Sequence, residues 1–118
     1  MAAANDELKL IVQTIYEKKG YNIITIDVTG ISSVTDFLII AEGSVDRHVK
    51  AIGEAVIQSA EKVGIEVIRT EGSQYGDWFV LDFGEFMVHL FTPELREKYA
   101  IERVWSAGKI LEIYPEGP

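Results

Sequence analysis

The sequence contains no cysteine. This absence excludes disulfide bonds, thiolate metal sites and thiol nucleophiles, and it fits a protein of a reducing compartment. Long apolar runs are missing as well, since no stretch approaches the roughly 18 residues that a membrane-spanning helix needs. Residues 1–7 have neither the basic nor the apolar segment of a signal peptide. We therefore expect a cytoplasmic protein that makes no membrane contact.

Basic residues are scarce. The chain has 11 Lys and Arg against 19 Asp and Glu, which gives a net charge of -8. Direct binding to nucleic acid normally needs clustered basic side chains that neutralise phosphates, and here they are scattered. We expect little or no direct contact with nucleic acid. A basic protein is a more suitable partner, because opposite charge speeds association.

The 118 residues, 47% of them hydrophobic, are enough for one domain with a single core. Hydrophobic periodicity predicts helices at residues 6–19, from Ser44 or Asp46 to residue 63, and at 93–99, with Gly20 and Gly64 as C-caps. A further short turn is expected at 102–105. Strands are predicted at 23–28, 37–41 and 65–69 and in a hairpin at 77–91. This order indicates the α/β class, with a mixed five-stranded sheet flanked by helices.

The hairpin is the most informative segment. Gly84-Glu85 has the form of a two-residue type II′ loop, with glycine in the first position. The resulting register puts apolar residues opposite each other on one face, as the pairs Phe83–Phe86, Leu81–Val88 and Phe79–Leu90. This face is expected to pack on the core.

The other face of the hairpin is unusual. It pairs Trp78 with Phe91, Val80 with His89 and Asp82 with Met87. A face of an antiparallel pair that meets water is expected to be mostly polar. Three helices, one of them short, are also too little to cover both sides of the sheet. We therefore predict that something other than water covers this face.

These residues resemble the signature of the ribosomal silencing factor (Iojap) family. The resemblance covers roughly residues 6–113, and the hairpin is its most specific part. The matching segments are residues 77–84, residues 88–94 with Tyr99, Asp27-Val28, residues 35–39, and the helix that follows Ser44 with Arg47 and His48.

The resemblance implies a domain related to the nucleotidyltransferase fold that forms a homodimer when free. It also implies binding to the large ribosomal subunit through ribosomal protein L-fourteen, where the bound factor blocks joining of the small subunit and represses translation. From the residues themselves we expect no catalytic residue, metal or cofactor.

Trp78 has two readings. Tryptophan is usually well buried, so it fits a core position. It is also a preferred anchor residue of protein interfaces. The partner-binding residues expected from the hairpin are those of its second face, Trp78, Val80, Asp82, Met87, His89 and Phe91. Tyr99 and Asp36 are expected to border them.

Two features raise the alternative of an enzyme. Asp82 and His89 lie diagonally on one face, yet a catalytic pair also needs a nucleophile or a metal. Gly43-Ser44 before a helix resembles a phosphate-holding loop of nucleotidyltransferases. That chemistry needs a strand Asp-x-Asp or Asp-x-Glu for magnesium, and the sequence lacks one. We therefore interpret Ser44 as a helix cap and the protein as no enzyme. Dimerisation as the only use of the second face is the third alternative.

Overall fold

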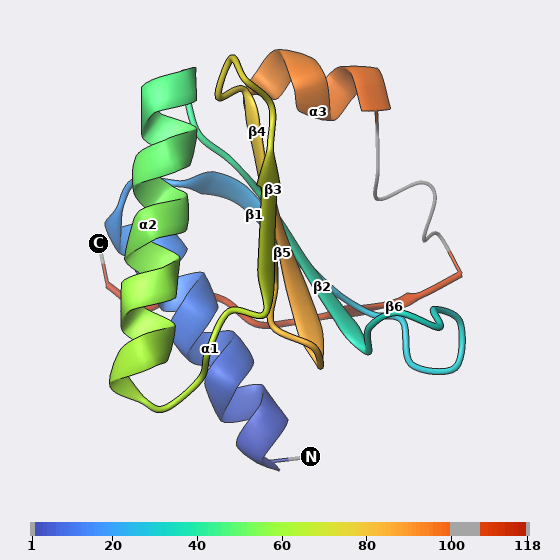
Figure 1. Cartoon of the computed structure of the whole chain (residues 1–118). Coiled ribbons are helices and arrows are strands. Elements are labelled where there is room, and N and C mark those ends of the chain that lie inside the picture. The colour runs from blue at the N-terminus through green and yellow to red at the C-terminus, as the bar shows by residue number, and fades with distance from the viewer. Residues whose placement is uncertain (1, 100–106, 118) are drawn as a thin grey trace.

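The computed structural model describes residues 2–99 and 107–117. Figure 1 shows a sheet with two long helices on one side and a short helix at one end of it. The elements are α1 (Ala2–Glu17), β1 (Tyr21–Asp27), β2 (Phe37–Glu42), α2 (Asp46–Lys62), β3 (Arg69–Gly72), β4 (Trp78–Asp82), β5 (Phe86–Phe91), α3 (Pro93–Tyr99) and β6 (Lys109–Leu111). The α/β class and the mixed sheet flanked by helices are confirmed.

The sheet has six strands in the order β3-β4-β5-β2-β1-β6, so the expected number of five is wrong. β2 and β5 are parallel, and the other neighbours are antiparallel. The unexpected strand is β6, whose three residues pair with Thr25, Ile26 and Asp27 of β1. So short and exposed a strand has no periodicity by which the sequence can reveal it.

The third strand lies further along the chain than predicted. Ile65 and Val67 pack against the core, but pairing with β4 begins only where the Ile68 N–H donates to the Asp82 carbonyl. β3 then runs along β4 from Arg69 to Gly72. The physical reason is the turn after Asp82. β4 ends there, so residues before Ile68 have no neighbouring strand to pair with.

Three helix ends also differ from expectation, and the first is the start of α1, which lies at Ala2 instead of residue 6. Helix α1 ends at Glu17, and Lys19, not Gly20, takes the left-handed conformation with φ 69°. Gly20 is required for another reason, because a Cβ there would lie 2.4 Å from Ile15 Cγ2. Helix α2 begins after Val45, which makes no side-chain capping bond, so the interpretation of Ser44 as a cap is wrong. The expected turn at 102–105 lies outside the described residues.

The side chain of His48, and not a capping hydroxyl, holds the start of α2 in place. Its Nδ1 accepts the Ser44 N–H at 2.9 Å, and its Nε2 lies 2.7 Å from the Lys18 carbonyl oxygen. The ring therefore carries its proton on Nε2 and joins the start of α2 to the end of α1. This contact fixes the entry into α2 without a hydroxyl cap.

The predicted hairpin register is confirmed at every pair from Trp78–Phe91 to Asp82–Met87. Gly84 has a φ of 94°, as the first position of a type II′ loop requires. The Phe83 N–H donates to the Phe86 carbonyl, and the two rings stack with centroids 4.8 Å apart. The hairpin therefore presents the two faces that the sequence predicts.

The two faces of the sheet carry separate clusters. Helices α1 and α2 cover one face, which we call the helix-covered face, and Leu81, Val88 and Leu90 are fully buried there. On the second face a smaller cluster joins residues of four strands, the residue after β1 and α3, namely Ile24, Ile26, Val28, Leu38, Ile40, Trp78, Met87, Phe91 and Leu95. No helix in the described part of the chain is long and apolar enough to cross a membrane.

A candidate partner-binding face

The second face runs across β4, β5, β2 and β1. On β4 and β5 it carries the six predicted residues in the order that the hairpin register sets. Phe91 is buried, and the other five are half-buried: Trp78, Val80, Asp82, Met87 and His89. These residues are brought together as expected, and β2 adds Leu38 and Ile40 beside them. Leu38 and Ile40 are themselves buried, so the partly exposed apolar area of this face lies on β4 and β5, at Trp78, Val80 and Met87. Such an area on two adjacent strands is a surface that a protein partner can cover.

His89 is an uncharged member of this face. It is the cross-strand partner of Val80 and lies beside Ile40 on β2. Burial lowers the pKa of His89 from 6.5 to about 4, because desolvation disfavours the imidazolium. Its ring stacks on Phe91 with centroids 6.2 Å apart. At neutral pH the imidazole is therefore neutral and packs as a flat, weakly polar group.

The carboxylate of Asp82 makes its contacts with Gly84 and Arg69 rather than with His89. One of its oxygens accepts the Gly84 N–H at 2.8 Å, and the other lies 3.6 Å from Arg69 Nη2 on β3. The carboxylate thus holds the hairpin turn and pairs with a side chain of the neighbouring strand. The arrangement assigns Asp82 a structural contact at the turn and a negative charge at the edge of the second face.

Asp36 and Tyr99 lie at opposite ends of the second face. Asp36 is exposed, and its N–H donates to the Glu85 carbonyl at the hairpin turn. Tyr99 is the last residue of α3, which begins just after the other end of β5. The position of its side chain lies outside what the structure describes. Asp36 therefore lies at the hairpin-turn end of the face, and a role of Tyr99 at the face stays a prediction.

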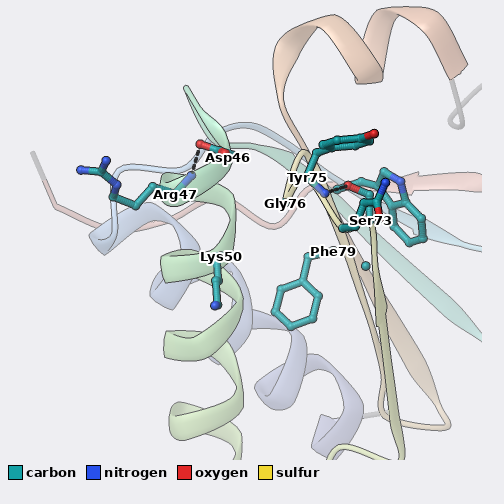
Figure 2. Close-up of a pocket in the computed structure, with 10 residues that line it drawn as sticks. Asp46, Arg47, Lys50, Ser73, Tyr75, Gly76 and Phe79 are labelled. Carbon is teal, nitrogen blue, oxygen red and sulfur yellow. Dashed lines mark hydrogen bonds between the residues drawn. The ribbon is translucent and has the colours of Figure 1, made fainter.

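A cleft beside Trp78 was missed by the sequence reasoning. It has a volume of about 370 Å³ and lies between the start of α2 and the loop from β3 to β4. Figure 2 shows Phe79 pointing from β4 toward α2, which bears Lys50, while Arg47 turns away from the strands. The Phe79 ring packs directly against Gly53 of α2, because a Cβ on Gly53 would lie 2.2 Å from Phe79 Cδ2. The sequence could not predict this cleft, because nothing in the small polar residues of the β3–β4 loop indicates that the loop faces α2.

A buried ion pair was missed as well. Arg96 on α3 and Glu42 at the end of β2 approach to 3.2 Å between Nη1 and Oε2, with side chains 11% and 10% exposed. Asn22 on β1 donates its amide to the same Glu42 oxygen at 3.2 Å. Arg96 also donates to the Asn22 carbonyl. The partners come from three segments far apart in sequence, so no local sequence pattern predicts these contacts.

Metal chemistry has no evident place in the part of the chain that the structure describes. No group of three or more His, Asp or Glu side chains there is arranged to hold an ion. The Gly43-Ser44 segment packs its glycine tightly, because a Cβ on Gly43 would lie 2.9 Å from the Val49 nitrogen. The Ser44 hydroxyl lies 3.2 Å from His48 Nδ1. The segment therefore serves the junction of the two long helices.

Comparison with known proteins identifies the family of the chain. The family model described as "Ribosomal silencing factor during starvation" matches residues 1–116. The chain belongs to the ribosomal silencing factor family. A ribosomal silencing factor of Haemophilus influenzae is 35% identical, over 84% of this chain and 97% of that protein. One of Halalkalibacterium halodurans is 32% identical, over 93% of this chain and 95% of the other.

Solved structures and a more distant relative extend the family likeness. A crystal structure from Chromobacterium violaceum superposes with a TM-score of 0.82 at 28% identity, over 96% of this chain and 88% of that one. A crystal structure from Bacillus halodurans gives 0.79 at 31% identity, over 91% and 97%. A mouse protein named for mitochondrial assembly of the large ribosomal subunit is 26% identical, over 87% of this silencing-factor chain and 46% of its own length.

Proposed function

We propose that this silencing factor binds the large ribosomal subunit through ribosomal protein L-fourteen and blocks joining of the small subunit. The observation that supports this most is the second face, where Trp78, Val80 and Met87 are only half-buried on the paired strands of the hairpin. A tryptophan fixed among apolar neighbours is the kind of residue that dominates the energy of protein interfaces. The bound domain then obstructs the small subunit by its bulk and needs no chemistry of its own.

The charges around the face favour a basic partner. Asp36 and Glu85 are exposed at the hairpin turn, and Glu71 is exposed on β3 opposite Val80. With a net charge of -8, the domain attracts a positively charged surface and repels the phosphates of RNA. Ribosomal proteins that contact RNA are commonly basic, so one of them suits this face. Contact with nucleic acid is then small or absent.

The free protein has another use for the same face. A second copy of the chain presents the same apolar patch, and a two-fold pair buries both. We therefore expect a homodimer in the absence of ribosomes, in competition with ribosome binding. The proposal places the protein in the cytoplasm, where ribosomal subunits are found.

Co-sedimentation with ribosomal subunits tests the proposal. Wild-type protein is expected to travel with free large subunits and not with joined ribosomes, and less at high salt, because acidic steering is screened. Trp78→Ala is expected to lose this association. Val63→Ala is a matched control, because Val63 is exposed at the far end of α2. A stable dimer that never sediments with subunits would leave dimerisation as the use of the face.

A further inference from the structure

Helix α3 needs tertiary contacts to stay in place. It spans 7 residues, and a helix so short is unstable in water without support. Leu95 is its side chain in the second-face cluster. The next residue, Arg96, is turned into the protein, with its side chain only 11% exposed. Neighbouring residues of one short helix thus make an apolar and a charged contact.

The charged contact is built from three elements. Arg96 Nη1 lies 3.2 Å from Glu42 Oε2, and the same oxygen accepts the Asn22 side-chain amide at 3.2 Å. Arg96 also donates to the main-chain carbonyl of Asn22. Asn22 has a φ of 51° and lies in an irregularity of the β1–β2 pairing. We call Asn22, Glu42 and Arg96 the polar clamp.

The polar clamp lies at the Trp78 end of the second face. Glu42 is the register partner of Phe91 on β5, and Phe91 is in turn the partner of Trp78 on β4. Leu95 packs in the cluster that contains both of these aromatic rings. The position of α3 therefore determines what stands beside Trp78.

We propose that the polar clamp positions α3 for docking, so that Leu95 supports Trp78 and Phe91 and α3 forms one border of the docking surface. This inference rests on the proposed function of the second face. Removing one charge of a buried pair leaves the other without compensation, which is strongly unfavourable. Loss of the clamp therefore releases α3. A surface that is ordered before binding avoids the cost of ordering it during binding.

Two readouts on the full chain test the clamp. Hydrogen exchange of the free protein reports whether the amides of α3 stay protected, and co-sedimentation with large subunits reports docking. In Arg96→Met we expect α3 amides to exchange about tenfold faster or more, and affinity to fall about tenfold, while β5 stays protected. Arg96→Lys keeps the charge and is expected to recover part of both. Lys62→Met removes an exposed charge in the last turn of α2, on the other side of the sheet from the second face, and is expected to change neither.

Unchanged α3 exchange and unchanged affinity in Arg96→Met would overturn the proposal. If that variant unfolds altogether, Leu95→Ala decides, because it removes the support and keeps the clamp, and normal affinity there also counts against the proposal. Trp78→Ala in the same assay separates the two claims. If it binds normally, the docking face is wrong, while the exchange rates of α3 still test the clamp.

Discussion

The two faces of the β4–β5 hairpin differ in how completely the chain itself covers them. On the helix-covered face Leu81, Val88 and Leu90 are fully buried under α1 and α2. On the second face Val80 and His89, which alternate with these residues, stay half-buried. The middle of the helix-covered face is therefore filled by intramolecular packing, whereas the second face keeps partly exposed apolar area at Trp78, Val80 and Met87. Substitutions on the two faces should accordingly separate stability from binding.

The largest effect is expected on the helix-covered face. Leu90→Ala removes a fully buried side chain and should lower the free energy of unfolding by about 2–5 kcal/mol. Val80→Ala, on the second face of the neighbouring strand, should cost clearly less. Urea denaturation of both variants checks this. Equal losses would mean that the two faces are equally important to folding, and the comparison would fail.

A pH effect of similar size is expected from His89. Its pKa is about 4 in the folded protein and 6.5 when unfolded, so folding favours the neutral ring. Stability is complete above pH 6.5, falls as the pH drops because the unfolded chain takes up a proton first, and levels off near pH 4. The full loss is about 3 kcal/mol. Denaturation of wild type and His89→Gln at pH 7 and pH 4.5 measures the difference, and equal pH dependence in both proteins would exclude His89 as its source.

The smallest effect is expected at the border of the second face. Asp36→Asn removes one exposed charge and should leave stability within about 0.5 kcal/mol of wild type. It should slow association with large subunits at low salt, with the difference fading at high salt. Association kinetics at two ionic strengths check this. Faster dissociation or a salt-independent change would speak for a direct contact rather than steering.

Local chemistry explains which parts of the structure could be predicted. The hairpin register follows from Gly84-Glu85, because a two-residue loop with glycine first leaves only one way to pair the strands. The periodic stripes of α1 and α2 likewise predict both long helices. The start of β3 could not be predicted, since Ile65 and Val67 look like a strand but pack without a partner strand. Pairing depends on where β4 ends, which is a property of the assembled sheet.

The candidate site likewise contains residues that the sequence predicts and contacts that it does not. Alternation along two strands was enough to place Trp78, Val80 and His89 on one face. The contact of Arg96 with Glu42 was not predictable, because it joins residues separated by 54 positions. Its partners share no periodicity, and only the folded chain brings them together. The shape of the cleft at Phe79 depends on tertiary contact in the same manner.

The affinity of folded Trp78→Ala for free large subunits tests the central claim most directly, when it is measured beside its free energy of unfolding. The account predicts a loss of about 2–4 kcal/mol in binding, which is roughly 30-fold or more, with the fold intact by circular dichroism. Affinity equal to wild type, or a loss that merely follows unfolding of the domain, would contradict the claim that the second face is kept for a partner.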